Sequence, residues 1–481
     1  MALEFMDKIS PFIPSVEGPK GQLSLREKML WTAGVMSIFF LLYSTYAIGV
    51  NQQAVTNSIY QIISIISAAK IGSIITVGIS PIVLSSVLLQ LFSGSGLFEI
   101  DMNNPVDKGR FQSLQKLLAI TLAFVEAFIY VLTGFVPLAS PGMMGLVVIQ
   151  LAIGAVIVLM LDETMTKYGI TSGINLFIVG GVSYAVIAGI FTVLIPDAVG
   201  AISAGGAAAL ANAVLAFGPL FAAIGIFLVS IYAYEMKVEL PLAFNQIRGV
   251  GGRLPIPFLY VSVLPVILAS SMEAALIVWF RIIAHVTGSF ENLARFIALY
   301  QPVNGVLQLN GGIIYLISPQ FPSPYTIGGY GPYFSYLATH ATQLFLPFGG
   351  FVMVPEWVHM ITYTLVLVIL CVIFGKFWVE MTGQSPKEMS SQLEEMGWQI
   401  PGFRRDPRIV ENVLNRYIPT ITVLGSIFVG LLAAIATLTG AIGTGMGILL
   451  SVGIIYMLYQ QLEQEKLYET YPMLDKIVGH Q

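Results

Sequence analysis

Ten long apolar stretches are the feature of this chain that most restricts its fold. They lie at about 29–50, 72–93, 115–136, 143–161, 172–195, 213–236, 257–280, 355–379, 418–437 and 441–461. Each is close to the roughly 20 residues that a helix needs to cross a bilayer. The chain is 56% hydrophobic and 10% charged, whereas soluble domains carry about 25% charged residues. The sequence therefore predicts an all-α polytopic membrane protein with ten transmembrane helices, because strands of a β-barrel would be shorter and alternate in polarity.

The basic residues predict how this bundle is oriented. Of the 22 Lys and Arg residues, all except Lys70, Arg281 and Arg295 fall on one side of the membrane when the N-terminus is placed inside. Loops on the cytoplasmic side of a membrane carry an excess of Lys and Arg. We therefore expect both termini in the cytoplasm.

The connections between the apolar stretches predict the organisation of the chain. We expect an N-terminal segment (1–28), a first half (29–195), an external linker (196–212), a second half (213–461) and a tail (462–481), with an external loop at 285–354 and basic cytoplasmic loops at 237–256 and 380–417. The external loop is rich in Gly, Pro and aromatic residues, and we expect it to fold back on the membrane surface or over the bundle. The two five-helix halves would be pseudo-symmetric, an arrangement common in transporters, and this repeat is a hypothesis.

The hydrophobic segment at 57–93 is interrupted. Its first piece, residues 57–70, is too short to span, and Lys70 and Gly72 separate it from a second piece that carries Gly78 and Pro81. A broken helix at membrane depth is tolerated only where protein or a water-filled cavity satisfies its backbone. We therefore predict that this segment lines a path through the protein.

No catalytic or metal-binding pattern emerges from the sequence. The motifs HExxH, GxSxG and GxxxxGK[ST] do not occur, and the four histidines, at 285, 340, 359 and 480, lack the spacing of metal ligands. We interpret His340 and His359 as surface or interface histidines and the single Cys371 as a small packing residue. An enzyme is therefore disfavoured, and we expect no cofactor and no metal.

Two acidic residues leave ion-coupled transport open. Glu126 and Glu273 each stand alone in an otherwise apolar span. Coupled transporters place charge at membrane depth, but a single acid in a span is also typical of a buried polar group that packs helices together. The charge pattern favours packing without excluding transport.

Pairs of branched aliphatic residues raise a different possibility. Ile79 and Val83 share one helix face, as do Ile174 and Ile178. Taken alone, such pairs face lipid or neighbouring helices. A ring of them facing a pore would exclude water and ions by dewetting.

Five segments of the sequence resemble one known family. They read IGSIITVGISPIVLSSVLLQLFSGSG, KYGITSGINLFIVGGVS, EMKVELPLAFNQIRGVGGRLPIPFLYVSVLPVILAS, GFRRDPRIVENVLNRYIPTITVLG and GAIGTGMGILLSVGIIYMLYQQLE. In this order they resemble the SecY family, the α subunit of the protein translocation channel, in its archaeal and eukaryotic branch. The external loop at 285–354 is longer than the resemblance leads us to expect, so no role is carried over to it.

The resemblance implies roles for particular residues. The pore ring would consist of Ile79, Val83, Ile174, Ile178, Ile267 and Leu450. The plug, a short half-helix before the second span, would consist of Asn57, Ser58, Ile59, Tyr60, Gln61, Ile62, Ile63, Ser64, Ile65, Ile66, Ser67 and Lys70. Lys70 would influence gating, or would simply end the plug helix at the interface. A lateral gate would lie between the second and seventh spans, with the third and eighth behind it.

The resemblance also implies partners. Arg248 and Arg253 in one cytoplasmic loop, and Arg404, Arg405 and Arg408 in another, would contact ribosomal RNA phosphates. The less favoured alternative is that these arginines only follow the positive-inside rule and contact no partner. The family works as a heterotrimer with a SecE (γ-type) subunit and a small β-type subunit, and it handles polypeptides that bear signal sequences.

We therefore predict a channel in the cell membrane, or in the endoplasmic reticulum membrane of a eukaryote. It would move unfolded secretory polypeptides across the membrane and release signal sequences and transmembrane segments laterally into lipid. A secondary transporter that depends on Glu126 or Glu273 is the alternative, and a membrane scaffold a distant third. Co-purification of two small membrane subunits and ribosomes would favour the channel.

Overall fold

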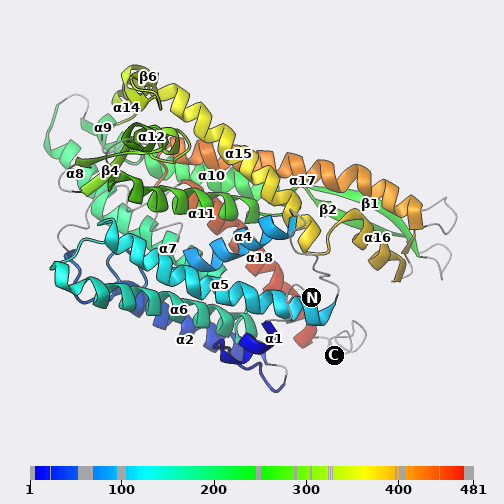
Figure 1. Cartoon of the computed structure of the whole chain (residues 1–481). Helices are drawn as coiled ribbons and strands as arrows, with labels where there is room; N and C mark the ends of the chain where they lie inside the picture. Colours follow the sequence, from blue (N-terminus) through cyan, green and yellow to red (C-terminus); the bar gives the residue numbers. More distant parts are fainter. Residues whose placement is uncertain are drawn as a thin grey trace.

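The structure is a computed structural model in which most of the chain is described. The described residues are 6–21, 23–52, 69–94, 104–206, 209–244, 251–285, 290–303, 306–322, 324, 327, 329–395, 398–399, 407–443 and 445–470. They form a bundle of long helices that run in roughly the same direction, with short strands at its two ends (Figure 1).

Ten helices of the described chain coincide with the ten predicted spans. They are α2 (Leu25–Ser44), α4 (Ser80–Gly94), α5 (Pro105–Leu132), α6 (Met144–Tyr168), α7 (Gly173–Gly189), α10 (Gly218–Glu235), α11 (Leu264–Trp279), α15 (Glu356–Met381), α17 (Pro407–Leu438) and α18 (Gly445–Thr470). A π-helical turn (Ile190–Leu194) continues α7 into α8 (Ile195–Ser203). Shorter helices are α1 (Met6–Ile9), α9 (Ala209–Ala216), α12 (Glu291–Ile297), α13 (Ile313–Leu316), α14 (Tyr330–Thr339) and α16 (Pro386–Glu395), with 3-10 turns at Ser10–Phe12, Pro141–Met143 and Phe280–His285.

Among the described residues, eight helices are long and apolar enough to cross a membrane. The helices α2 and α4 do not meet that combined criterion. The prediction of one helix over 72–93 was wrong in its first third, because α4 begins only at Ser80. Its 15 residues rise about 22 Å, less than the roughly 30 Å of hydrocarbon, so α4 by itself is too short to span.

Polar side chains fix where some helices begin. At the start of α2, the Ser24 Oγ accepts a hydrogen bond from the Glu27 amide at 3.3 Å, and the Glu27 carboxylate accepts one from the Ser24 amide at 2.9 Å. This reciprocal pair is a capping box. At the start of α7, the Asp162 carboxylate accepts a hydrogen bond from the Ile174 amide at 2.9 Å. Because Asp162 lies near the end of α6, this bond also fixes the tight connection between the two helices.

The long helices pack in two groups. In the first, α5 packs against α4 and α6, and α2 packs against α6 and α7. In the second, α15 packs against α11 and α17, and α18 packs against α10 and α17. The groups meet where α4 contacts α11 and α15, where α5 contacts α11, and where α7 contacts α18. One large hydrophobic cluster draws residues from both groups.

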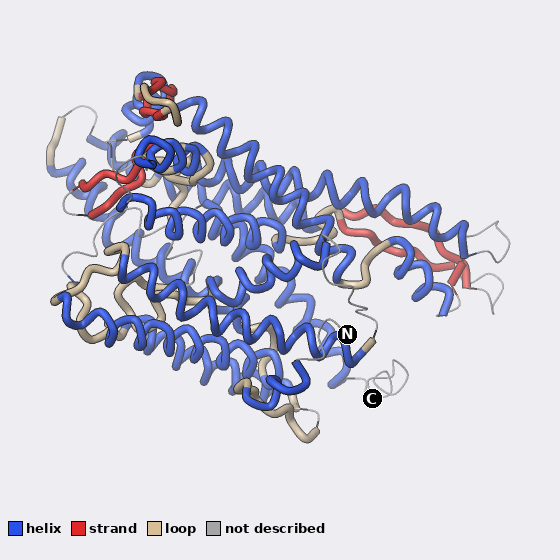
Figure 2. Tube along the Cα trace, viewed as in Figure 1, coloured by secondary structure: helices blue, strands red, loops and turns tan. Residues whose placement is uncertain are grey.

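Three small antiparallel sheets were not predicted. One has the order β2–β1–β7, from β1 (Lys237–Phe244), β2 (Gly251–Pro257) and β7 (Trp398–Gln399). The others are the hairpins β3 (Leu299–Val303)–β4 (Val306–Gly311) and β5 (Ala341–Phe345)–β6 (Phe351–Pro355). Figure 2 shows the strands gathered at opposite ends of the bundle. The predicted long loop at 285–354 is thus largely made of short helices and hairpins.

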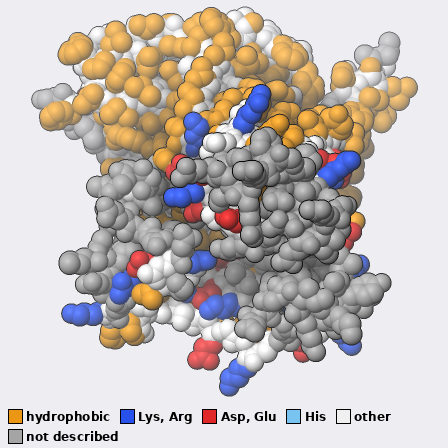
Figure 3. Space-filling model, turned by 90° about the vertical axis from the view of Figure 1, so that its right-hand side faces the viewer, with side chains coloured by type: hydrophobic (Ala, Val, Ile, Leu, Met, Phe, Trp, Pro, Cys, Tyr) orange, Lys and Arg blue, Asp and Glu red, His pale blue; other side chains and the backbone are white. Residues whose placement is uncertain are grey.

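The two ends of the bundle differ in charge. We call the end with the chain termini, β1, β2 and α16 the basic end, and the end with α12, α14 and hairpins β3–β4 and β5–β6 the distal end (Figure 1). Figure 3 views the basic end, where Lys and Arg side chains are spread over the described surface. Lys116 lies 2.7 Å from the Glu163 carboxylate and joins α5 to α6.

Candidate functional site

The six residues of the predicted ring come from four helices and the coil before one of them, and they belong to one hydrophobic cluster. Five are buried members of it and Ile174 is partly buried against it. They are Ile79 just before α4, Val83 in its first turn, Ile174 and Ile178 on α7, Ile267 on α11 and Leu450 on α18. The fold therefore brings together residues up to 371 positions apart in the chain. Their role as a ring stays a prediction.

The predicted break in the helix is present. Gly72 and Gly78 have φ of +87° and +60°, a left-handed conformation that glycine adopts without strain. Hydrogen bonds hold the first part of this coil, because the Ala47 amide donates to the Gly72 carbonyl at 2.9 Å and the Ile74 amide donates to the Thr45 carbonyl at 3.0 Å. The coil from 71 to 79 is therefore an ordered, non-helical part of the bundle wall.

A glycine on α6 lets this coil approach closely. A Cβ at Gly154 would lie 2.0 Å from the Ile74 carbonyl oxygen, a distance no side chain can occupy. Lys70 lies just before the coil, with its Nζ 4.6 Å from the centre of the Tyr46 ring. Of the predicted plug residues, Lys70 lies in the described chain, and 57–67 lie outside the described residues.

The two acidic residues within the spans are both buried. Glu126 on α5 accepts a hydrogen bond from the Ser80 hydroxyl at 3.2 Å, and so joins α5 to the first residue of α4. Neither carboxylate oxygen of Glu273 on α11 finds a hydrogen-bond partner in the described part of the chain. The contact made by Glu126 is that of a polar group linking two helices.

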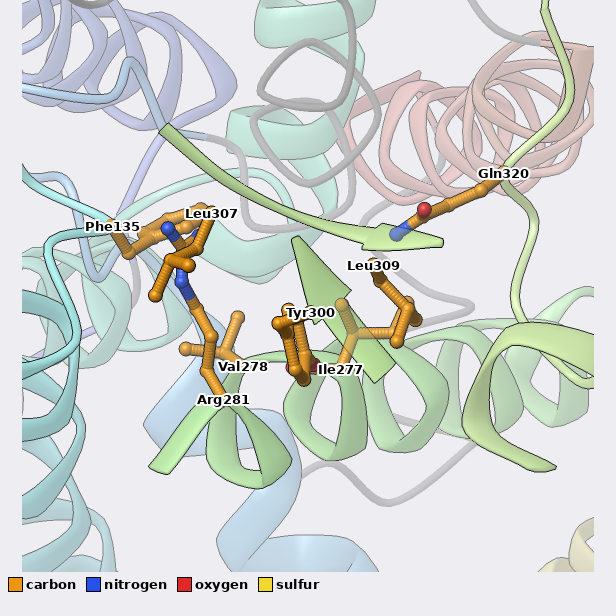
Figure 4. Close-up of a pocket in the computed structure, with 8 residues that line it drawn as sticks. All are labelled: Phe135, Ile277, Val278, Arg281, Tyr300, Leu307, Leu309 and Gln320. Atoms are coloured by element: carbon orange, nitrogen blue, oxygen red, sulfur yellow. The ribbon is translucent and has the colours of Figure 1, made fainter. Parts of the chain in front are cut away.

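A seam separates the two helix groups on one side of the bundle. Leu84 on α4, Leu122 on α5 and Ala275 on α11 form a small separate hydrophobic cluster across it. Towards the distal end, the Arg281 guanidinium stacks over the Phe135 ring at 5.4 Å, and both residues line a small cavity (Figure 4). The seam has the position predicted for the lateral gate. These contacts join residues more than 35 positions apart in the chain, so no local sequence pattern predicts them.

The two basic loops are joined in one sheet. Strand β1 pairs with β2 over seven residue pairs, and at its far end Ala243 and Phe244 pair with Gln399 and Trp398. The segments that carry the two arginine groups therefore leave the bundle side by side. Of the predicted residues, Arg253 lies on β2 and Arg408 in the first turn of α17, whereas Arg248, Arg404 and Arg405 lie outside the described residues.

Arg253 is the predicted contact residue whose surroundings are defined. Its side chain is 77% exposed, and its Nη1 lies 2.6 Å from the Glu239 carboxylate on β1. The hydrogen bond from Arg253, helped by its charge, lowers the pKa of Glu239 below its ordinary value. The guanidinium retains exposed N–H groups that could meet a phosphate.

The prediction for His359 was wrong. This residue on α15 is 1% exposed, with Nδ1 at 2.7 Å from the Glu356 carboxylate and Nε2 at 2.9 Å from the Ser318 carbonyl oxygen. The Tyr315 hydroxyl donates to the same carboxylate at 3.0 Å. His340, by contrast, is exposed as predicted. The sequence offers a weak signal in retrospect, because Glu356 and His359 are spaced i, i+3 at the start of a span.

Comparison with known proteins then decides the family. The SecY family model matches residues 73–459, which include the coil, the ring residues, the seam and the basic sheet. The chain belongs to the SecY family. The fold class predicted from the sequence, a ten-span helical membrane protein in two halves, is confirmed, because the SecY and Sec61 channels to which the chain is similar have this architecture.

Individual relatives of this SecY-family chain support the assignment over nearly its full length. The chain is 36% identical over 479 residues to the protein translocase subunit SecY of Methanococcus vannielii, covering 98% of this chain and 99% of the relative. A structure on the plug domain of the SecY protein, described as stabilising the closed translocation channel and maintaining a membrane seal, matches with a TM-score of 0.77 and 34% identity. Sec61 in the canine ribosome–channel complex of the endoplasmic reticulum matches with a TM-score of 0.75 and 34% identity.

Both structural matches cover 96% of this chain and 98% of the other chain. The function predicted from the sequence is therefore confirmed at the level of the family. This SecY-family chain is a multi-pass membrane protein and the channel-forming subunit of a protein translocase. The family assignment therefore disfavours the alternative prediction, a secondary transporter.

Proposed function

We propose that Ile79, Val83, Ile174, Ile178, Ile267 and Leu450 form the constriction through which polypeptides pass. The observation that carries the proposal is that all six, which come from α4 and the residue before it, α7, α11 and α18, pack in one hydrophobic cluster shared by both helix groups. Branched aliphatic side chains resist water and ions by dewetting, and they offer a passing chain no polar group to hold it. The ring would close around a polypeptide and reseal after it.

The test is ion leakage of the resting channel in planar bilayers. The triple change Ile79→Ser, Ile174→Ser and Ile267→Ser should raise conductance, because hydroxyls would hydrate the constriction. Ile361→Ser is the matched control, because this isoleucine is exposed on the outer face of α15 and its change should leave conductance unaltered. Conductance equal to that of the unchanged chain in the triple variant would refute the ring.

We further propose that residues 57–70 form a plug that blocks the channel at rest. The coil at 71–79 that follows the segment is hydrogen-bonded to Thr45 and Ala47, just after α2, and packs on α6 at Gly154. It ends at the ring residue Ile79, so a plug that precedes it would lie close to the ring. The similar SecY structure, whose plug maintains a membrane seal, supports this role. Deletion of residues 57–67 should raise the same resting conductance as the ring variant, and an unchanged leak would contradict it.

The seam between α4 and α5 on one side and α11 and α15 on the other is our proposed lateral gate. Contacts across it are mainly apolar, apart from the stacking of Arg281 on Phe135, so the two sides can separate with few hydrogen bonds lost. The pair Leu84→Cys and Ala275→Cys should, once oxidised, block release of a transmembrane segment into lipid. Normal release from the cross-linked channel would contradict the assignment.

The proposal also covers the orientation of the chain in the membrane and its partners. The basic end would face the cytoplasm and bind the ribosome through Arg248, Arg253, Arg404, Arg405 and Arg408, supported by the exposed Arg253 and by the similarity to the canine ribosome–channel complex. The chain would have no catalytic activity, and the translating ribosome would supply the driving force. A SecE (γ-type) subunit and a small β-type subunit would complete a heterotrimer, and both should co-purify with the native chain.

A further inference from the structure

The hairpin β5–β6 at the distal end exposes apolar side chains and has no charged residue of its own. Residues 341–355, ATQLFLPFGGFVMVP, contain no Asp, Glu, Lys, Arg or His. Phe348 at the tip is fully exposed, and Phe351, Val352 and Met353 on β6 are 55%, 49% and 51% exposed. Consecutive residues of a strand point to opposite faces, so β6 is apolar and open on both faces. A surface of this kind indicates an interaction site.

The outer face of α15 leads directly into this hairpin. Exposed apolar residues recur on successive turns of α15 at Trp357, Ile361, Leu365, Ile369 and Ile373. The opposite face is buried, at Tyr363, Leu367 and Cys371 among others. Since α15 is a membrane-spanning helix of this family, its exposed stripe is a lipid-facing surface. Hairpin β5–β6 joins the end of that stripe through Pro355 and Glu356.

The length of α15 places the hairpin at the depth of the membrane interface. From Trp357 to Lys376 the helix rises about 29 Å, close to the roughly 30 Å hydrocarbon thickness of a bilayer. Trp at one end and Lys at the other are typical of the two interfaces. The chain before Trp357 therefore leaves the hydrocarbon where the headgroups begin. Figure 1 shows β6 beside the N-terminal end of α15, at the outer edge of the bundle and not over its axis.

The foot of the hairpin is firmly held, so its tip is presented in a fixed direction. The Glu356 amide donates to the His340 carbonyl at 3.0 Å, just below the pairing of Ala341 with Pro355. The Thr342 hydroxyl donates to the buried Glu356 carboxylate at 3.3 Å. On the other side, the Arg295 guanidinium lies 5.5 Å from the Phe345 ring.

We propose that the tip of hairpin β5–β6 inserts into the lipid headgroup region of the leaflet at the distal end, as a second membrane contact of the channel beside its spans. Lipid is the occupant that these observations favour, because the apolar surface continues a lipid-facing stripe, lies at interface depth and carries no charge that a protein partner would pair. Phenylalanine rings fit the boundary between headgroups and acyl chains. The contact would fix the distal end of α15, one wall of the proposed lateral gate, relative to the bilayer.

The test is the depth of a spin label on the full chain in phosphatidylcholine nanodiscs. The single cysteine is buried in α15 and is replaced first, as Cys371→Ala. Spin labels are then attached in two separate variants, Phe348→Cys and Met353→Cys. The second variant tests the same hairpin if the substitution of Phe348 disturbs the local structure of the tip. The control is Asn292→Cys, an exposed polar position on α12 in the same distal region. Collisions with oxygen report lipid, and collisions with a water-soluble nickel chelate report solvent.

The ratio of oxygen to nickel collisions at 348 and 353 should exceed that at 292 several-fold. Equal ratios at all three positions would overturn the proposal, because the tip would then lie in water. A label at 348 that is immobile and shielded from both reagents would also overturn it, since another protein would then cover the tip.

Discussion

The two ends of the bundle use the same backbone unit in opposite ways. At the basic end, β1–β2 is an antiparallel hairpin that leads into the spanning helix α11, and at the distal end β5–β6 leads into the spanning helix α15. The first carries Lys237, Glu239 and Arg253, whereas the second carries no charged residue. Main-chain pairing supplies a rigid projection in both cases. Side chains then give the two projections different surfaces, a charged one on β1–β2 and an apolar one on β5–β6.

The hairpins also differ in what holds them. Glu239 and Arg253 form an exposed ion pair, of a kind that contributes little to stability because water and salt screen it. The distal hairpin instead stands on a buried cluster of Glu356, His359, Tyr315 and Thr342. Buried polar groups are costly to leave without a partner. The distal end should therefore be much more sensitive to loss of a single side chain.

The largest effect is expected from Glu356→Ala, which would remove the common partner of His359, Tyr315 and Thr342. Breaking a buried charged contact costs about 3–5 kcal/mol, so thermal unfolding in detergent should shift clearly downward and hydrogen exchange in β5–β6 should rise. Glu291→Ala is the control, because it removes an exposed pair with Arg295 and should cost less than about 1 kcal/mol. Equal shifts for the two variants would remove the distinction between a buried and an exposed charged contact.

The second-largest effect is expected on ribosome binding at the basic end. The double reversal Arg248→Glu and Arg404→Glu should weaken ribosome binding at least about tenfold at low salt and flatten its salt dependence, because fewer counterions are released. Arg26→Glu is the matched control, an exposed arginine of the same end on α2. Sedimentation with ribosomes at increasing salt measures the effect. Full-strength binding of the double variant would leave these arginines a topological role alone.

The smallest effect is expected from pH at β1–β2. The hydrogen bond and charge of Arg253 lower the pKa of Glu239 in the folded chain. The pair therefore stabilises the hairpin above the ordinary pKa of a glutamate, and this stabilisation is lost as pH falls through the lowered value. With Arg253→Gln, the carboxyl should titrate at a higher pH in carbon-13 NMR. Lys237→Gln should change the titration less, because the Arg253 contact is the main cause of the shift.

Part of the fold could be read from local patterns. Runs of about 20 apolar residues are set by the thickness of the bilayer, and the predicted interruption at Lys70 and Gly72 lies in a coil that continues to Ile79. The ring residues followed from i, i+4 pairs only once the family resemblance joined them. The hairpins were not predicted from the sequence. An exposed apolar strand such as FVMVP has the same composition as the membrane span that follows it, so it reads as the start of that span.

The sequence by itself determined the number and placement of the spans, the concentration of basic residues at one end, the break before α4 and the family. Only the tertiary structure decided that α4 starts at Ser80 against Glu126, that β7 joins the two basic loops, and that His359 is buried beside Glu356. The physical reason is the distance along the chain over which each effect acts. Bilayer thickness and helix periodicity act on neighbouring residues and leave a repeating pattern, whereas contacts between residues far apart in the chain exist only once the helices have packed.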